Sequence, residues 1–216
     1  MSTVEESTIG DNTIIGDFAR VRNSAIGEYV RIDRNNLVQN CNVGDYSYTG
    51  PFCMIFNAEI GRFTSISYGV TIGPPEHDYK RLSMHPFIYN KGYDIIDDSE
   101  LVRNNKFDSP CKIGNDVWIG CNSTILRGVE IPDGVVVGAN SVVTSTPPAF
   151  SILAGCPAKV IKMRFDDEII KELQTIKWWK YDNRTLSKCA KFFLKEEVTL
   201  SDCLKLKSLI EENTNK

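Results

Sequence analysis

The sequence predicts a mainly β fold: a parallel β-helix with a long inserted loop, followed by a C-terminal helical extension. Three observations predict it, namely a six-residue repeat of aliphatic residues, a break of that repeat in mid-chain, and helical periodicity near the C-terminus. The repeat is strictest between residues 113 and 143. Its aliphatic positions there are Ile113, Ile119, Ile125, Ile131, Val137 and Val143. A period of six fits neither an α-helix nor a flat strand, so it indicates a solenoid.

Each six-residue unit is expected to form one short strand and one corner. The aliphatic side chain points inward, and a small or β-branched residue four positions later packs beside it. These smaller residues are Val117, Ser123, Val129, Val135 and Ser141. Gly114, directly after Ile113, suits the unusual backbone angles of a corner. Three units would close one triangular coil, and coils stacked about 4.8 Å apart would bury each other's inward side chains.

Residues 1–73 carry a looser form of the same repeat. Its aliphatic–glycine pairs are Ile9-Gly10, Ile15-Gly16, Ile26-Gly27, Val43-Gly44, Ile60-Gly61 and Ile72-Gly73. From Val43 to Ile60 the count is seventeen residues, one short of three units. A slip of one residue would turn side chains to the wrong face of a flat sheet. In a solenoid we expect a corner to absorb it.

Between residues 74 and 112 the period disappears. This segment holds both histidines of the chain, His77 and His85, together with Tyr79, Tyr89 and Tyr93. A long insertion without a repeat of its own, inside a compact domain, is usually functional or disordered. We therefore expect a loop that projects from the side of the β-helix and carries functional side chains.

The repeat ends at Pro147-Pro148. Residues 154–159 are expected to form a final turn and residues 160–164 a last strand, so the β-helix domain would span residues 1–164. A helical extension would follow over residues 165–216. Asp166 is expected to cap its first helix. The end of that helix, Lys177-Trp178-Trp179, is expected to dock on the solenoid. Two weaker helices are expected near residues 186–194 and 202–212, the second capped by Ser201, with fraying from residue 211.

The composition excludes several classes of function. A net charge of −3 offers no basic surface for nucleic acid or an anionic membrane. No apolar run approaches the roughly 18 residues of a membrane span, and the polar start MSTVEESTIG does not resemble a signal peptide. Seven cysteines without a CxxC pair argue against a disulfide framework and a zinc site. We expect small buried thiols in a cytoplasmic protein.

Several motifs resemble one known family. Residues 73–89 place a histidine just after a coil and a Pro-Phe step behind it, and three later segments match as well: residues 113–120 (IGNDVWIG), 154–159 (AGCPAK) and 164–179, which end in IKWW. Together they resemble the xenobiotic acetyltransferase branch of the hexapeptide-repeat acyltransferases, which includes chloramphenicol and streptogramin acetyltransferases. The resemblance implies a left-handed β-helix, a homotrimer, and metal-free transfer of an acetyl group from acetyl-CoA to a hydroxyl or amine of a small acceptor.

The resemblance also implies that His77 is the general base, because it lies where the family has its catalytic histidine. A hydroxyl attacks a thioester efficiently only as its proton is removed, and histidine titrates near neutral pH. A backbone carbonyl, rather than the adjacent Glu76 or Asp78, is expected to orient the imidazole. His85, Tyr79 and Phe87 are expected to line the acceptor pocket, with simple loop packing as the competing interpretation.

Residues implied for acetyl-CoA lie later in the chain: Trp118, Gly120, Gly138, Ala139, Lys159 and Arg164. Trp118 is expected to point outward, either as a wall of a cleft near His77 or against a partner subunit. The small corner at Gly138 would admit the pantetheine arm. Lys159 and Arg164 would neutralise the phosphates of CoA, or else form a solvated basic turn.

Three other functions stay open at this point. The Ser-Met-His-Pro-Phe segment at residues 83–87 also resembles sugar and polysaccharide acetyltransferases. A carbonic anhydrase on the same fold would need three histidines on zinc, and this chain has two. A non-catalytic binding solenoid would not need a long loop that carries histidines.

Overall fold

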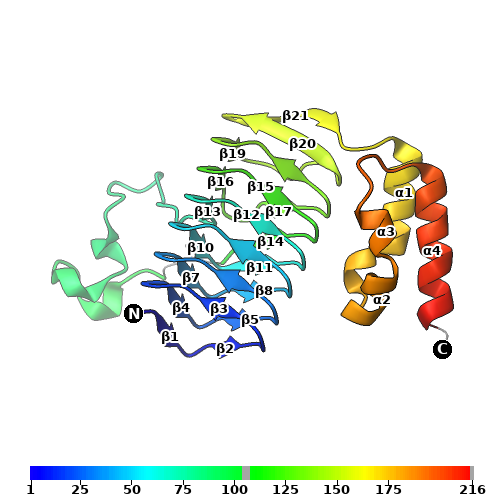
Figure 1. The fold of residues 1–216 in the computed structure, drawn as a ribbon. Coiled ribbons are helices and arrows are strands. Elements are labelled where there is room, and N and C mark those ends of the chain that lie inside the picture. The colour runs from blue at the N-terminus through cyan, green and yellow to red at the C-terminus, as the bar shows by residue number, and fades with distance from the viewer. Residues whose placement is uncertain (104–107, 215–216) are drawn as a thin grey trace.

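The computed structural model describes residues 1–103 and 108–214. Short strands wind into a left-handed parallel β-helix, which confirms the predicted fold class. Figure 1 shows the stacked coils, with an inserted loop on one side and a group of helices on the other. Three sheets, here named A, B and C, form the faces of the triangular coil, and the chain visits them in that order.

The strands are two to six residues long. Sheet A holds β1 (Thr3–Glu5), β4 (Arg20–Arg22), β7 (Leu37–Gln39), β10 (Met54–Phe56), β13 (Thr71–Ile72), β16 (Thr124–Ile125) and β19 (Val142–Val143). Sheet B holds β2 (Thr8–Ile9), β5 (Ala25–Ile26), β8 (Asn42–Val43), β11 (Ala58–Ile60), β14 (Cys111–Ile113) and β17 (Glu130–Ile131). Sheet C holds β3 (Ile14–Ile15), β6 (Arg31–Ile32), β9 (Tyr48–Thr49), β12 (Ser65–Ile66), β15 (Trp118–Ile119), β18 (Val136–Val137), β20 (Ser151–Gly155) and β21 (Ala158–Met163).

The core is a set of aliphatic ladders inside the coils. In sheet B, Ile60 pairs with Ile113 and Ile113 with Ile131, so each inward side chain stacks on the next. All three are buried, and the same holds for the inward residues of the later coils in sheets A and C. Apolar surface removed from water in this way is the main stabilising contribution to such a repeat. The predicted inward positions of the strict repeat are confirmed.

The early coils are one residue shorter than the late ones. Val21 pairs with Val38, seventeen positions on, whereas Ile113 pairs with Ile131, eighteen positions on. The missing residue lies between sheets A and B, where Val21 is followed by Ile26 after five positions instead of six. Asn23 turns this corner in the left-handed region, at φ 45°, and its amide bonds to Asn40 of the next coil at 2.8 Å. A corner therefore absorbs the slip, as expected.

The inserted loop leaves the β-helix at the same corner. It replaces the five-residue step between sheets A and B, because β13 ends at Ile72 and β14 begins at Cys111. The loop contains three short 3-10 helices, η1 (Pro86–Ile88), η2 (Lys91–Tyr93) and η3 (Asp98–Glu100). The predicted boundary at residue 112 is one to two residues late, because Cys111 and Lys112 already pair with β11. Residues 104–107 of the predicted loop lie outside the described residues.

The last coil closes with a hairpin. β20 and β21 run antiparallel, and the turn between them lies at Cys156-Pro157. The last strand thus begins at Ala158, two residues earlier than predicted. Five of the seven cysteines are buried as expected, but Cys121 is half-buried and Cys156, in this turn, is exposed.

The extension consists of α1 (Asp167–Ile176), η4 (Trp178–Lys180), α2 (Asn183–Lys188), α3 (Ala190–Phe193) and α4 (Leu200–Thr214). Three predictions here are wrong in detail. Asp166 precedes α1, but its side chain makes no capping hydrogen bond. The helix expected near residues 186–194 is two short helices that meet at Cys189. Helix α4 is capped by Thr199 rather than Ser201, because Thr199 and Asp202 exchange hydrogen bonds between side chain and backbone, at 3.1 and 3.3 Å.

Helix α4 also continues to Thr214, where the sequence predicted fraying from residue 211. Residues 215 and 216 lie outside the described residues. Within the described parts of the chain, no helix has the length and apolar character needed to cross a membrane.

Aromatic stacking joins the extension to the coils. Tyr29, Tyr46 and Phe63 occupy equivalent positions in successive coils, between sheets B and C, and their rings stack at 5.1 and 4.8 Å. The guanidinium of Arg62 donates a hydrogen bond of 2.6 Å to the carbonyl oxygen of Trp179. Trp179 itself is buried in a second core cluster, between the coils and the helices. The predicted docking of the Trp-Trp segment on the solenoid is confirmed.

Candidate active site

Each of the three corners of the coil carries a different part of the structure. The AB corner, between sheets A and B, carries the inserted loop with His77. The BC corner, between sheets B and C, carries the aromatic stack and the helices. The CA corner, between sheets C and A, carries Gly120 and Gly138, which directly follow β15 and β18.

His77 begins the projecting part of the loop. Its Nδ1 lies 2.7 Å from the carbonyl oxygen of Met84. Because a carbonyl oxygen only accepts hydrogen bonds, Nδ1 of the neutral ring carries the hydrogen and Nε2 keeps its lone pair. The imidazole is exposed, and its Nε2 is the ring nitrogen that does not contact the Met84 carbonyl oxygen. A backbone carbonyl orients the ring, as the sequence analysis expected.

The backbone before His77 is held against the next coil. Gly73 donates a hydrogen bond of 3.0 Å to the carbonyl oxygen of Ile125. A side chain at Gly73 would place its Cβ within 2.3 Å of the carbonyl oxygen of Phe56, and its φ is +66°, so only glycine suits this exit. Glu76 pairs with Arg127 at 2.9 Å. Arg127 and Met84 could not be predicted as partners from the sequence, since their contacts link residues that only the folded loop brings together.

His85 has the opposite arrangement. Its Nδ1 accepts a hydrogen bond of 3.3 Å from the backbone N–H of Phe87 and so caps η1. In the neutral ring Nε2 must then carry the hydrogen. The imidazole packs edge-on against Tyr93, with ring centroids 4.7 Å apart, and stacks on Phe87 at 5.7 Å. His85 and Phe87 thus lie in one cluster, whereas Tyr79 is 78% exposed and lies outside it.

Trp118 points outward from sheet C, as expected, and is 55% exposed. Sheet C is the face opposite the AB corner, because that corner joins the other two sheets. Trp118 and His77 therefore lie on opposite sides of one chain. Trp118 could therefore form a cleft wall near a histidine only against His77 of a neighbouring chain, and both expectations for Trp118 stay predictions.

Small residues gather along the CA corner. Gly120 donates a hydrogen bond of 2.8 Å to the carbonyl oxygen of Val137, and a Cβ on it would lie 2.6 Å from the backbone nitrogen of Ala139. Gly138 donates at 2.7 Å to Leu153 of the closing hairpin. On that hairpin Lys159 is exposed. The structure therefore brings Gly120, Gly138, Ala139 and Lys159 to one end of one corner.

Arg164 lies at a different corner. Its guanidinium bonds to Asp116 at 3.0 Å and to the carbonyl oxygen of Gly134 at 2.9 Å, and it stacks over Phe165 at 5.0 Å. Burial raises the pKa of Asp116, and the charge of Arg164 partly offsets this by favouring the carboxylate. These partners belong to the BC corner, so Arg164 is separated from Lys159 and its charge is already matched.

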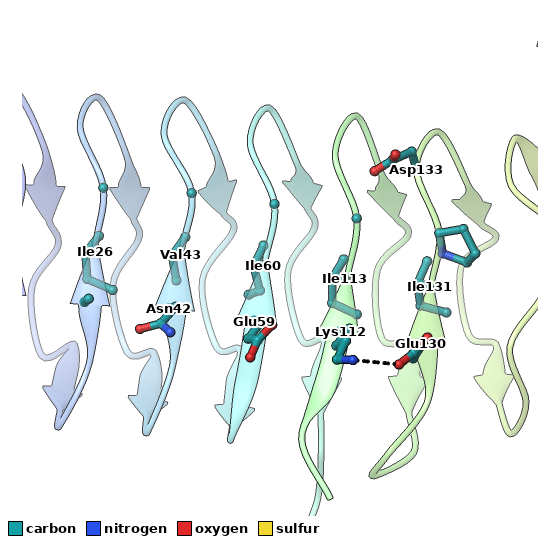
Figure 2. Close-up of a pocket in the computed structure, with 16 residues that line it drawn as sticks. Ile26, Asn42, Val43, Glu59, Ile60, Lys112, Ile113, Glu130, Ile131 and Asp133 are labelled. Carbon is teal, nitrogen blue, oxygen red and sulfur yellow. Dashed lines mark ion pairs between the residues drawn. The ribbon is translucent and has the colours of Figure 1, made fainter. Parts of the chain in front are cut away.

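A shallow groove of about 700 Å³ lies on the outer face of sheet B. Figure 2 shows the residues that line it. It is lined by corner glycines and by the outward side chains Asn42, Glu59, Lys112 and Glu130. Lys112 pairs with Glu130 at 3.0 Å, and this contact raises the pKa of the lysine. With carboxylates in excess over its one paired lysine, the groove is poorly suited to the phosphates of CoA. None of the catalytic, cofactor-binding or acceptor-binding residues predicted from the sequence lines this groove.

Across residues 1–103 and 108–214, histidine, cysteine, aspartate and glutamate side chains form no group of three or more that could hold a metal ion. The absence of a metal from the reaction stays a prediction.

Known acetyltransferases are similar to this chain over more than half of its length. The family model described as bacterial transferase hexapeptide (six repeats) matches residues 110–145. A probable macrolide acetyltransferase of Lysinibacillus sphaericus is 37% identical over 128 residues, which are 58% of this chain and 70% of the relative. A chloramphenicol acetyltransferase of Morganella morganii is 37% identical over 122 residues, which are 55% of this chain and 57% of that relative. The match thus spans little more than half of the chloramphenicol relative.

One solved structure shares the fold over most of its length. AntD, an N-acyltransferase from Bacillus cereus, has been crystallised with dTDP and 3-hydroxybutyryl-CoA. It superposes with a TM-score of 0.60 at 24% sequence identity, over 82% of this chain and 92% of that chain. At this sequence identity the likeness shows a shared fold and no more.

Proposed function

Because this chain belongs to the xenobiotic acetyltransferase branch of the hexapeptide-repeat acyltransferases, we propose that it transfers the acetyl group of acetyl-CoA to a small acceptor. The acceptor would present a hydroxyl or an amine, and it would be an antibiotic or a sugar. The observation that carries the proposal is the hydrogen bond between His77 Nδ1 and the Met84 carbonyl oxygen, at 2.7 Å. It leaves Nε2 free to take a proton.

In the proposed reaction, Nε2 of His77 removes the proton from the acceptor as its oxygen or nitrogen attacks the thioester carbonyl carbon. A new C–O or C–N bond forms, and the carbonyl electrons move onto oxygen. When they return, the C–S bond breaks and the CoA sulfur takes the proton from the imidazolium. Backbone N–H groups would stabilise the oxyanion. The products are the acetylated acceptor and CoA, and the histidine ends as it began.

The two histidines differ in their fitness for this role. Nδ1 of His85 accepts from the Phe87 N–H, and its ring is packed between Phe87 and Tyr93. In the neutral ring its Nε2 would carry a hydrogen and could not accept a proton. This favours His77 as the base. It gives His85 a structural role in its cluster with Phe87 and Tyr93, which would lie beside the acceptor.

We infer a homotrimer with the site between two chains. His77 lies at the AB corner, while the small residues proposed for acetyl-CoA lie at the CA corner, so one chain does not bring them together. Large apolar side chains are exposed on sheet C and along the CA corner: Ile14, Phe18, Tyr48, Phe52, Tyr68 and Trp118. An apolar face of this kind indicates a protein interface. Packing it against the AB corner of a neighbour would complete the site.

Acetyl-CoA would then run along the CA corner past Gly120, Gly138 and Ala139, with Lys159 near its phosphates. Because Arg164 is paired with Asp116, we propose that it supports the fold rather than the cofactor. The histidine mechanism requires no metal, and a cytoplasmic location would suit the supply of acetyl-CoA.

A thiol-release assay tests the proposal directly. Acetyl-CoA is supplied with chloramphenicol, a macrolide, a streptogramin or a sugar, and free CoA thiol is measured. We expect thiol release that depends on one of these acceptors and that survives dialysis against a strong chelator. Release that is restored only by added zinc, or no acetyl transfer with any hydroxyl or amine acceptor, would contradict the proposed function.

A further inference from the structure

We propose that the ion pair between Arg127 and Glu76 positions His77, an inference that rests on the proposed function. Glu76 directly precedes His77 in the chain. Its Oε2 lies 2.9 Å from Nη2 of Arg127, which follows β16 at the AB corner of the next coil. The pair therefore ties the first residues of the loop to a rigid part of the β-helix, 51 positions further along the chain.

The same coil holds this segment at a second point. Gly73 bonds to the carbonyl oxygen of Ile125 at 3.0 Å, and Ile125 lies two positions before Arg127. Between the two anchors stand Pro74 and Pro75, whose rings restrict their backbone rotation. The segment from residue 73 to residue 77 thus has two anchors and a stiff middle. Little freedom is left to the backbone that carries the imidazole.

The surroundings of Arg127 set this pair apart from another ion pair of the loop. The side chain of Arg127 is 16% exposed, whereas that of Arg81, which pairs with Asp78 at 3.0 Å, is 46% exposed. A charge shielded from water is screened less by solvent and salt. The Arg81 pair also lies wholly within the loop, so it cannot fix the loop relative to the coils. Arg127 acts through Glu76 and is a positioning residue.

Nuclear magnetic resonance of the imidazole nitrogens tests the proposal without any acceptor. The chain has two histidines, so each ring can be followed separately. At a pH of about 8.5, where an ordinary histidine is neutral, we expect hydrogen on Nδ1 of His77 and on Nε2 of His85. Arg127→Gln should shift the ¹⁵N signals of His77 toward an average of the two tautomers and leave His85 unchanged. Arg127→Lys, which keeps the charge, should preserve most of the wild-type pattern.

Two further variants make the experiment decisive. Glu76→Gln removes the carboxylate of the pair, and the side chain of Glu76 is more exposed than that of Arg127. This variant should therefore reproduce the His77 shift even if Arg127→Gln does not fold. Lys112→Gln removes the cation from another ion pair of the coils, at 3.0 Å on sheet B, and should leave both histidines unchanged. Signals of His77 that stay at their wild-type values in Glu76→Gln, or that move together with those of His85, would overturn the proposal.

Kinetics give the second readout. With acetyl-CoA and the acceptor that turns over in the thiol-release assay, Arg127→Gln should lower kcat by about 10- to 100-fold and change KM for acetyl-CoA little. In a His77→Ala background the same substitution should cost nothing further. An equal additional loss in that background would overturn the positioning role. If His77→Ala itself keeps full turnover, the proposed role of His77 as general base fails, while the resonance experiment still decides whether Arg127 holds the ring.

Discussion

The ring of Phe63 packs against the ring of Trp178, with centroids 4.9 Å apart. Phe63 belongs to a corner of the β-helix, and Trp178 begins η4 of the extension. Trp178 also contacts Phe193 edge-on at 5.0 Å. One half-buried indole therefore connects the aromatic stack of the coils to the short helices beyond α1.

Trp178→Ala should loosen this connection. We expect a loss of about 2 kcal/mol in the free energy of unfolding, because a half-buried aromatic side chain and its ring contacts are removed. Urea denaturation at a fixed protein concentration measures it. Tyr29→Ala is the matched control, since Tyr29 is the exposed end of the same stack and should cost about 1 kcal/mol or less. Equal losses in the two variants would show that the contact to the extension contributes nothing specific.

Asp202 should make stability depend on pH in acid. Hydrogen bonds from Lys195 and then from Thr199 lower the pKa of Asp202 from 3.8 to about 2. The unfolded chain then binds this proton at a higher pH than the folded chain does. Stability from this group is therefore complete above pH 4 and is lost as the pH falls from about 4 to about 2.

Asp202→Asn should remove that part of the pH dependence. At pH 7 the variant should be less stable than the wild type, because the charge at the start of α4 and the ion pair are lost. Below pH 2 the difference should nearly vanish. Thermal melting between pH 2 and pH 7 checks both ends. Lys195→Met, which keeps the Thr199 cap, should show a smaller version of the same effect, and a difference that stays constant with pH would contradict the assignment.

Trp118→Glu should weaken the proposed trimer. A carboxylate placed on the apolar face of sheet C would have to be buried without a partner when the chains associate. Light scattering at micromolar concentration should give a trimeric mass for the wild type and a smaller mass for the variant. Ala25→Glu is the control, because residue 25 points outward from sheet B and should leave the trimer intact. A monomeric wild type would contradict the interface.

Much of the fold follows from the six-residue repeat. Ile113, Ile119 and Ile125 were placed inward by their spacing alone, and each is buried. The repeat works as a signal because every coil must present the same inward position to its neighbours. The helix boundaries were less predictable. Thr199 rather than Ser201 caps α4 because the reciprocal bonds with Asp202 decide the start of the helix, although serine is by residue type the slightly better cap. The division of the chain at residue 164 stays a prediction.

The site was predictable only where it is local. The position of His77 just after a coil could be predicted from the end of the repeat, and a backbone carbonyl could be expected to orient its ring. Which carbonyl it is, and the pairing of Glu76 with Arg127, depend on the corner at which the loop leaves the coils. The corner at which the loop leaves the coils also determines that Trp118 and His77 lie on opposite sides of one chain. The ion pair of Arg164 with Asp116 depends on the return of the chain after the closing hairpin, which no local pattern reveals.

The central claim is that His77, and not His85, takes the proton from the acceptor. The most direct test compares His77→Ala with His85→Ala in steady-state kinetics, after light scattering shows that both keep the wild-type mass. His77→Ala should lower kcat by roughly 10²- to 10⁴-fold while the affinity for acetyl-CoA changes little, and His85→Ala should act mainly on KM or on loop stability. Loss of turnover in His85→Ala with full turnover in His77→Ala, or full turnover in both, would contradict the account.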